Sequence, residues 1–330
     1  MNSGWFDSES FHAALRLLAD GNFHSGEQLG ALLGVSRAAV WKTLKKFELL
    51  GIKVLSVKGK GYCIEGGVDL LDKVNIQTQY SDNLDINIFT QLDSTNSYLL
   101  RQKKPENQVC LAEIQTAGRG RRGRNWISPF AQNLYLSIAW KFDGGLAAME
   151  GLSLAIGVGI VRALGLHGVN GLNLKWPNDL LYKGKKLGGV LIEISGDPLG
   201  DCLCVVGIGI NVSMDKEASG SIGQPWINLN EILTEQTIPL ISRNQLASSL
   251  LDQLILILST YQRDGFELYR NEWLMAAAYL NQEVNVLAGK EIQTGILRGI
   301  DGLGALQVSI GGVEQSFHGG EISLRGAHVP

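Results

Sequence analysis

Four arginines within seven residues dominate the chemistry that this sequence offers. The segment 118–124 reads Gly-Arg-Gly-Arg-Arg-Gly-Arg, so that glycines separate the cations. Three glycines in so short a segment disfavour a stable helix or strand, and guanidiniums are suited to clamp a multiply charged anion such as a phosphate. The segment therefore predicts a loop that is mobile when empty and becomes ordered around an anion.

Lysines elsewhere in the chain extend the prediction of a phosphate site. Lys175 opens the segment Lys-Trp-Pro-Asn-Asp, and Lys186 ends the run 183–186, in which two other lysines compete for the same role. The sequence has no P-loop of the form G-x-x-x-x-G-K-[ST], so a nucleotide would be held another way. Arg119, Arg121 and Lys186 are the candidates for neutralising an α-phosphate. Taken alone, the arginine run fits an RNA-binding or merely solvated loop equally well.

Other reaction classes find little support in the sequence. The five histidines stand in no triad-like context, and there is no nucleophile elbow. Neither an H-E-x-x-H motif nor a cluster of carboxylates and histidines indicates a metal hydrolase. The run 207–211, Gly-Ile-Gly-Ile-Asn, lacks the third glycine of a dinucleotide fingerprint. Anion handling by cations is therefore the favoured chemistry.

The composition is that of an ordinary folded protein with room for more than one domain. The chain has 330 residues, of which 45% are hydrophobic and 18% charged, and a formal net charge of −3. These values argue against disorder and against a uniformly basic nucleic-acid coat protein. The four cysteines show neither zinc-ligand nor disulfide spacing, which indicates reduced thiols. With no signal-peptide pattern and no apolar run of membrane-spanning length, we expect a soluble cytoplasmic protein without a membrane partner.

Basic residues gather near the N-terminus. Residues 36–60 contain seven lysines and arginines and one acid, Glu48, a charge pattern typical of nucleic-acid binding. Helical spacing over 11–20, a capping-box helix over 25–33 and a longer helix over 36–50 predict a helix-turn-helix.

The third of these helices has the two faces of a DNA-recognition helix. Val40, Leu44 and Phe47 fall in one sector, and basic or small residues fall in the opposite sector. Strands at 54–57 and 62–64 flank a basic turn, which predicts the wing of a winged helix-turn-helix. The predicted DNA contacts are Ser36, Arg37, Ala38, Lys42, Lys45, Lys58 and Lys60. A small helical domain whose lysines only solvate its surface is the alternative.

The rest of the chain mixes strands and helices. Strands are expected at 86–89, 109–114, 133–140, 172–176, 188–194 and 204–210, and helices after Ser94 and at 151–164 and 243–273. The connections are short, which favours a mixed or antiparallel sheet backed by helices over a doubly wound sheet. Five short strands from residue 283 onward, with Asp301-Gly302 as a hairpin turn, predict a small β-barrel at the C-terminus.

Five motifs, taken in order, resemble those of biotin–protein ligases. They are Ser94-Thr95-Asn96, the segment 115–124 that contains the arginines, Lys175–Asp179, Lys186–Gly189 and the run 207–211. With the winged N-terminus, nearly the whole chain resembles the bifunctional biotin ligase and biotin operon repressor of bacteria.

The resemblance implies an α+β protein of three domains. They are a winged helix-turn-helix over 1–66, a biotin- and ATP-binding domain of class II synthetase-like fold over 67–275, and an SH3-like barrel over 276–330. It implies that biotin and ATP, with Mg²⁺, give biotinyl-5′-AMP, and that biotin then passes to a lysine of the biotin carboxyl carrier protein of acetyl-CoA carboxylase. It further implies that biotinyl-5′-AMP acts as a corepressor that promotes a homodimer on operator DNA.

The resemblance also assigns the candidate site residue by residue. The implied biotin contacts are Ser94, Thr95, Asn96, Gln115, Gly118, Arg119, Gly120, Arg121 and Lys186, with Arg119 and Lys186 as the catalytic candidates. The implied nucleotide contacts are Arg121, Lys175, Asn178, Asp179, Asn211, Trp226 and Arg325, with Glu321 as a secondary candidate and no metal ligand assigned. Two alternatives stay open: a lipoate-ligase-like enzyme and a biotin-sensing transcription regulator without catalysis.

Overall fold

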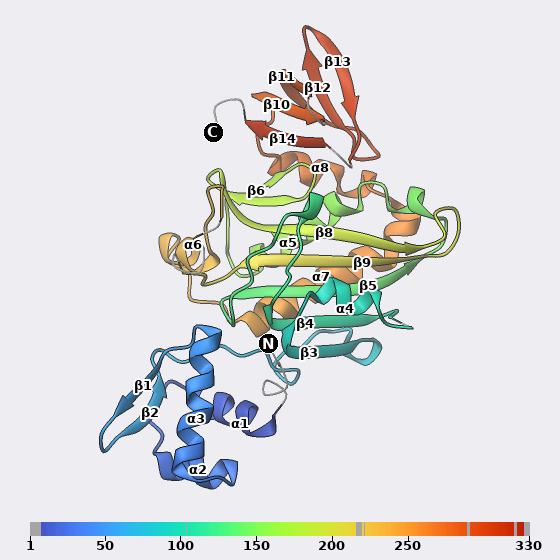
Figure 1. Ribbon diagram of the computed structural model, residues 1–330. Helices are drawn as coiled ribbons and strands as arrows, with labels where there is room; N and C mark the ends of the chain where they lie inside the picture. Colours follow the sequence, from blue (N-terminus) through green and yellow to red (C-terminus); the bar gives the residue numbers. More distant parts are fainter. Residues whose placement is uncertain are drawn as a thin grey trace.

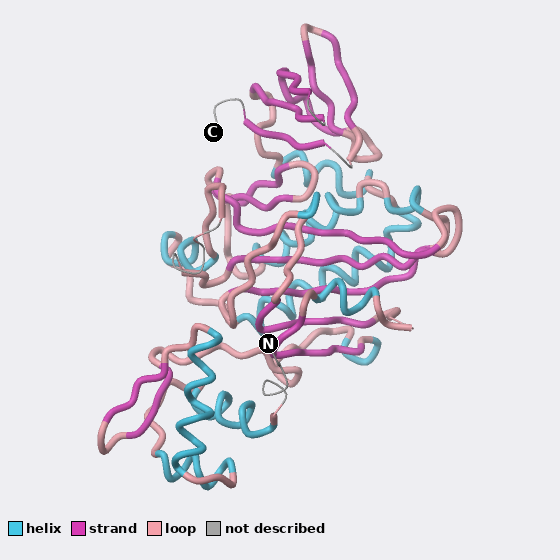
Figure 2. The backbone as a smooth tube through the Cα atoms, in the orientation of Figure 1, coloured by secondary structure: helices cyan, strands magenta, loops and turns pink. Residues whose placement is uncertain are grey.

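Three bodies follow one another along the molecule in the computed structural model (Figure 1). The structure describes residues 8–103, 105–215, 220, 222–288, 291–319 and 322–326. A small helical body with a two-stranded sheet comes first, a seven-stranded sheet with helices lies in the middle, and a five-stranded sheet comes last (Figures 1 and 2). The predicted α+β fold class with these three parts is confirmed.

The N-terminal body is the predicted winged helix-turn-helix. Its elements are α1 (Glu9–Leu18), α2 (Gly26–Leu33), α3 (Arg37–Phe47), η1 (Glu48–Leu50), β1 (Val54–Val57) and β2 (Gly61–Ile64). The hydroxyl of Ser25 accepts from the backbone N–H of Gln28, and the Gln28 side chain accepts from that of Ser25, so the predicted capping box is present. Gly34 ends α2 in the left-handed conformation with φ of +62°.

The central body is a mixed sheet with helices on both faces. Its strands are β3 (Asp85–Leu92), β4 (Gln108–Gln115), β5 (Asn133–Phe142), β6 (Leu172–Lys175), β7 (Asp179–Tyr182), β8 (Lys185–Gly196) and β9 (Cys202–Asn211). They lie in the order β3-β4-β5-β9-β8-β7-β6, with β3 and β4 parallel and the other neighbours antiparallel. The prediction of a mixed rather than a doubly wound sheet is therefore confirmed.

The helices of this body divide between the two faces of the sheet. They are α4 (Thr95–Leu100), α5 (Leu152–Gly165), α6 (Leu229–Glu235), α7 (Arg243–Asp264) and α8 (Glu267–Ala276), with single 3₁₀ turns at η2 (Ser81–Asn83), η3 (Arg121–Gly123) and η4 (Leu146–Met149). Helices α5 and α7 lie behind the sheet in the view of Figure 1, and α4 lies in front of it. The front face, next to α4, is where the candidate site forms.

Helix α5 is the apolar centre of this body. The stretch Leu146–Gly165 has the length and composition of a membrane span, but most of its side chains are buried inside the protein, against α7, α8 and the sheet. A Cβ atom built on Gly159 would lie 2.6 Å from Cδ1 of Ile257, so glycine is what lets α7 pack this closely. The span-like composition is thus that of a core helix.

The C-terminal body is an antiparallel, SH3-like sheet that shares the central core. Its strands are β10 (Glu283–Ala288), β11 (Glu291–Ile300), β12 (Leu306–Ile310), β13 (Val313–Phe317) and β14 (Ile322–Gly326), in the order β13-β12-β11-β10-β14. Val284 and Leu297 belong to the same apolar cluster as α5, and the indole N–H of Trp176 donates to the carbonyl of Gly304 at 3.0 Å. Because the core runs through residue 276, the division into 1–66, 67–275 and 276–330 stays a prediction.

Candidate active site and DNA-binding surface

One cavity of about 720 Å³ brings together most of the predicted site residues. It lies on the front face of the central sheet, between the arginine-rich segment, the β6–β7 turn and the segment 222–226. The predicted residues that line it are Ser94, Thr95, Asn96, Gln115, Arg119, Gly120, Arg121, Lys175, Asn178, Asp179, Lys186, Asn211 and Trp226. These residues come from six separate stretches of the sequence, and the fold brings them together in one site.

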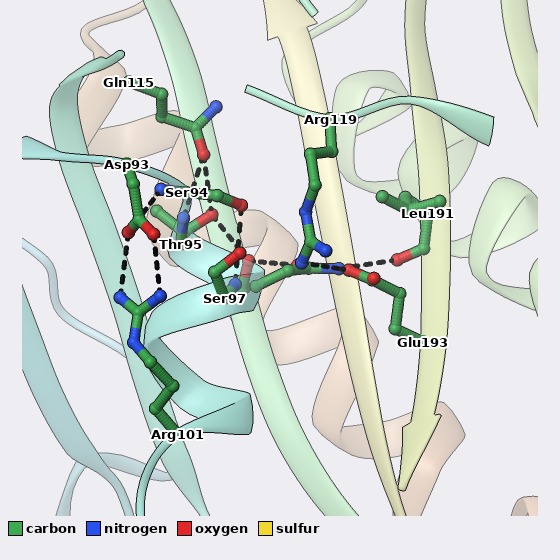
Figure 3. Close-up of polar contacts among 11 residues, drawn as sticks. Asp93, Ser94, Thr95, Ser97, Arg101, Gln115, Arg119, Leu191 and Glu193 are labelled. Atoms are coloured by element: carbon green, nitrogen blue, oxygen red, sulfur yellow. Dashed lines mark hydrogen bonds and ion pairs between the residues drawn. The ribbon is translucent and has the colours of Figure 1, made fainter. Parts of the chain in front are cut away.

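A row of buried polar side chains lines one end of the cavity (Figure 3). Ser94, Thr95 and Asn96 at the start of α4 are only 3–4% exposed. Oε1 of Gln115 accepts from the backbone N–H of Thr95 at 2.9 Å and faces its hydroxyl at 3.2 Å. The hydroxyl of Ser137, on β5, lies 2.7 Å from that of Thr95 and 2.6 Å from Oδ1 of Asn96. Such a row offers both donors and acceptors to a neutral polar ring.

One end of this polar row connects to the arginine-rich segment, and the other connects to Ser128, four residues beyond that segment. Nδ2 of Asn96 donates to Oε2 of Glu193 at 2.9 Å, and the guanidinium of Arg119 lies 2.7 Å from the same oxygen. At the other end, Nε2 of Gln115 donates to the hydroxyl of Ser128 at 3.0 Å. Arg119 is thus held by Glu193 beside the polar row, within reach of an anionic group on a ligand bound there.

Lys186 and Asp179 form the charged centre of the cavity. Nζ of Lys186 lies 2.6 Å from Oδ1 of Asp179, and Nζ of Lys175 lies 3.5 Å from Oδ2. Burial alone would raise the pKa of Asp179, but the two ammonium groups outweigh burial and lower this pKa below its ordinary value. Asp179 therefore stays ionised and holds two cations at the middle of the site.

The position of Lys186 depends on an irregularity in β8. The β7–β8 register shifts between Leu180 and Leu181, and a bulge of this kind re-aims a side chain. The backbone of Lys186 also bonds the segment that carries Trp226, donating to the carbonyl of Pro225 and accepting from the N–H of Ile227. Lys186 is 17% exposed at its side chain, unlike the hairpin-tip Lys183 at 65%.

The other predicted nucleotide residues surround this charged centre. Nη1 of Arg121 donates to Oδ1 of Asn178 at 3.3 Å, and Nδ2 of Asn178 donates to the carbonyl of Val190 at 2.7 Å. Nδ2 of Asn211 donates to the carbonyl of Ile227 at 3.2 Å. Asn178 and Asn211 thus line the cavity, and their side-chain amides also hold the backbone of its wall by hydrogen bonds.

The remaining candidates are Gly118, Arg325 and Glu321, and none of them is among the described residues that line the cavity. Gly118 lies just outside it, where an added Cβ atom would come within 2.6 Å of the Ser128 hydroxyl. Arg325 is in β14 between Leu324 and Gly326, which do line the cavity, but its side chain is outside the described part of the structure. Glu321 also falls outside the described residues.

Several residues of the site escaped the sequence analysis. Ser137 and Glu193 contact lining residues from behind the cavity wall. Trp126 lines the cavity itself, with Nζ of Lys186 at 5.5 Å from its ring centre. The buried indole N–H of Trp126 has no hydrogen-bond partner among the described residues, which leaves a donor for a ligand. Tyr279 lines the cavity from the junction with the C-terminal body at a φ of +65°, and burial, with Asp179 nearby, raises its pKa. Of these residues, only Trp126 could have been suspected from the sequence, because it follows the arginine-rich segment closely.

Metal binding by protein side chains alone finds no support in the described parts of the chain. Within them, no group of three or more His, Cys, Asp or Glu side chains gathers at one point. Asp179, the acid in the cavity, is already paired with two lysines.

The N-terminal body presents the predicted basic surface to solvent. Ser36 caps α3, its hydroxyl accepting from the backbone N–H of Ala39 at 3.4 Å, and Val40 and Phe47 are fully buried. The remaining predicted DNA contacts are all exposed: Arg37, Ala38, Lys42 and Lys45 on α3, and Lys58 and Lys60 in the turn of the wing. The structure thus brings the recognition helix and the wing together in one body, as a winged helix-turn-helix requires.

Family models match all three bodies of the chain. Residues 12–63 match the HTH domain, residues 88–211 match the biotin/lipoate A/B protein ligase family, and residues 279–325 match the biotin protein ligase C-terminal domain.

Relatives match the chain over nearly its full length. The bifunctional ligase/repressor BirA of Salmonella typhimurium is 41% identical over 95% of this chain and 97% of its own length. That of Escherichia coli is 40% identical over 95% of this chain and 96% of its own length. Among solved structures, the biotin protein ligase from Aquifex aeolicus in complex with biotin and ATP superposes with a TM-score of 0.62 at 27% identity, covering 74% of this chain and 99% of that one.

Proposed function

This chain belongs to the bifunctional biotin ligase/repressor family, and we propose that its cavity joins biotin to a carrier protein in two steps. In the first step, a carboxylate oxygen of biotin attacks the α-phosphorus of ATP. The bond from this phosphorus to the bridging oxygen of the β-phosphate breaks, and pyrophosphate leaves. In the second step, the amine of an acceptor lysine attacks the carbonyl carbon of biotinyl-5′-AMP, loses a proton and forms an amide, while AMP leaves.

We assign the polar row to the ring system of biotin. A cyclic urea presents one carbonyl oxygen and two N–H groups, and Ser94, Thr95, Asn96 and Gln115 offer matching hydroxyl and amide groups in a buried setting. With the ring held at this end, the carboxylate tail would extend toward Arg119 and the charged centre. Gly118 and Gly120 would let the arginine-rich segment close over the tail.

We assign the charged centre to the reacting phosphate. Lys186, Arg119 and Arg121 would neutralise the charge that develops on the α-phosphate oxygens, and no covalent bond to the enzyme is needed. Asp179 carries a negative charge, so its role would be to orient Lys186 and Lys175 rather than to contact phosphate. Asn178, Asn211 and Arg325 would complete the nucleotide side, with the Trp226 ring stacked on adenine.

Mg²⁺ would reach the site as part of the ATP substrate. The described residues build no carboxylate cluster for a resident ion, and a magnesium ion on the triphosphate would shield its charge before binding. The cavity residues then need only bind and orient the substrates and stabilise the charge that develops on the α-phosphate.

The proposal extends to the macromolecular partners of the protein and to its role as a repressor. We propose that the acceptor is the biotin carboxyl carrier protein of acetyl-CoA carboxylase, and that the protein works in the cytoplasm. Biotinyl-5′-AMP would act as a corepressor: once it has ordered the loops around the cavity, less conformational entropy remains to be lost on homodimer formation. The dimer would place two winged helices, with the contacts Ser36, Arg37, Ala38, Lys42, Lys45, Lys58 and Lys60, on a palindromic operator.

The continuity of the cavity carries the ligase proposal. A neutral polar row, a cationic centre and an aromatic wall at Trp226 follow one another in a single space, which fits an adenylate of a polar ring compound. ATP–pyrophosphate exchange with biotin, with lipoate and with neither acid tests it. We expect exchange that depends on biotin. Exchange with lipoate alone would favour a lipoate ligase, and no exchange with either acid would leave a regulator without catalysis.

A further inference from the structure

Trp41 is a large apolar side chain left in water on the proposed DNA-binding surface. It is the fifth residue of α3, and 52% of its surface is exposed. The apolar core of this body takes Val40, Leu44 and Phe47 from the same helix but not Trp41. Tryptophan is highly buried on average in folded proteins, so an exposed ring in this place needs a reason other than core packing.

Cations surround the Trp41 ring. Arg37 precedes it by one helical turn and Lys45 follows it by one turn, so the three side chains share a face of α3. Nζ of Lys45 lies 5.6 Å from the ring centre of Trp41, and Ala38 and Lys42 are the other exposed neighbours. The surface thus combines one broad apolar group with several positive charges.

We propose that Trp41 reads base identity in the major groove by apolar contact with a thymine methyl group. This inference rests on the repressor half of the proposed function. Side chains in the N-terminal part of a recognition helix reach base edges, and a thymine differs from the other bases there by its methyl group. Lys42 and Lys45 would bind phosphates, which fixes the helix in place without reading sequence. Trp41 would then be a specificity residue at the centre of the contact.

The charge around Trp41 favours DNA over a second copy of this chain as its partner. Glu48 is the one acid among residues 36–60, and it is paired with Lys45 at 2.8 Å. Two copies meeting through this surface would bring like charges together, whereas a polyanion is complementary to it. A similar pair joins the wing to the loop before α2, where Nζ of Lys60 lies 5.7 Å from the ring centre of Phe23, which is 39% exposed.

The DNA affinities of three variants distinguish recognition of the base sequence from electrostatic binding to the phosphates. The probes are a duplex enriched from a random library by the full-length protein with biotinyl-5′-AMP and a scrambled duplex of the same composition. Trp41→Ala is expected to weaken binding to the enriched duplex by about 10- to 100-fold and to leave the scrambled duplex unchanged. Lys42→Met should weaken both and reduce the salt slope by about one. Leu32→Ala, a control on α2 with 53% exposure, should change neither.

Replacing each thymine of the enriched duplex by deoxyuridine removes one methyl group at a time. The wild-type protein should bind more weakly when deoxyuridine stands at one or two positions of each half-site. The affinity of Trp41→Ala should not change when the same positions are substituted. Trp41→Phe, which keeps an apolar ring, should retain part of the methyl effect. Melting temperatures of the variants report on folding and should match that of the wild type, because Trp41 lies outside the core.

Three results would overturn the inference alone. The first is that Trp41→Ala binds both duplexes like the wild type, and the second is that it loses affinity for both equally. The third is that its sedimentation without DNA differs from that of the wild type, which would assign the ring to self-association. A wild-type protein that enriches no duplex would overturn the repressor function together with this inference, so the two failures are distinguishable.

Discussion

Lys186 and Asp179 face each other across neighbouring strands, with Nζ 2.6 Å from Oδ1, at the centre of the cavity. Asp179 also holds Lys175, so one carboxylate organises two ammonium groups. Because the pKa of Asp179 is lowered by these lysines against the effect of burial, the arrangement is charged before any substrate arrives. Such preorganised charge can stabilise a transition state without reorganising at the moment of reaction.

Lys186→Met should reduce the rate of adenylate formation by about 10²- to 10³-fold, as the loss of one preorganised donor does in other enzymes. The KM for biotin should change much less, because the polar row at 94–96 is untouched. Steady-state pyrophosphate exchange measures both constants. Lys185→Met is the matched control, since the neighbouring Lys185 is exposed and should tolerate the change. Equal losses in the two variants would contradict the role assigned to Lys186.

The stability of Lys186→Met should depend on pH in a defined direction. The folded pKa of Asp179 is lowered, so its ionisation stabilises the wild type above the unfolded pKa of about 3.9, and this contribution is lost as the pH falls through the lower folded value. Without Lys186, burial is less opposed and the folded pKa rises. The variant should therefore melt below the wild type at about pH 6, with a smaller difference near pH 3. A difference independent of pH would count against this charge pairing.

Gly207→Ala should damage biotin binding selectively. Gly207 lies opposite Ser137 in the β5–β9 pair, and an added Cβ atom would overlap Oδ1 of Asn96. Displacing this amide should raise the KM for biotin by about 10²-fold, the cost of misplacing a binding group by about 1 Å. The KM for ATP should change much less, because Asn96 belongs to the polar row and not to the proposed nucleotide side. Gly165→Ala, where an added Cβ atom meets nothing within 4 Å, controls for folding, and parallel rises in both KM values would contradict the assignment.

Local signals made much of the fold predictable. The capping box at Ser25 and the N-cap at Ser94 depend on residues three positions apart, so the sequence alone is enough to place α2 and α4. Strand positions could be predicted from short apolar runs, because these runs are also local in the sequence. The boundaries differ by a few residues, as in β8, which begins at Lys185 rather than near Gly188.

The site was less predictable where strand register decides it. Ser137 stands in an apolar run and reads as core, and only its pairing with Gly207 brings it to Asn96. Three lysines at 183–186 compete equally in the sequence, and the register shift in β7–β8 is what distinguishes Lys186. Glu193 gives no signal at all, because its partner Arg119 is distant in the chain. Pairing between distant strands is not encoded in local patterns.

Arg243→Met should destabilise the protein more than a surface change on the same helix. Nη2 of Arg243, a side chain 1% exposed, lies 2.7 Å from Oε2 of Glu113, whose other oxygen accepts from the N–H of Leu71. Arg243 also donates to the carbonyl groups of Asn133 and Asp69. Its loss would leave the Glu113 charge buried and unpaired, which costs about 3–5 kcal/mol in comparable cases. Urea unfolding followed by tryptophan fluorescence measures this cost.

Two further variants make the Arg243 prediction specific to the buried pair. Arg263→Met, in the exposed pair with Asp264 on the same helix, should change the free energy of unfolding by no more than about 0.5 kcal/mol. Adding Glu113→Leu to Arg243→Met should recover part of the loss, because an apolar pair of similar volume needs no counter-charge. If the double variant were less stable than Arg243→Met by the full cost of a second core change, the unpaired charge would not be the cause. The loss would then be assigned to the hydrogen bonds from Arg243 to Asp69, which lies in the segment that follows the winged domain.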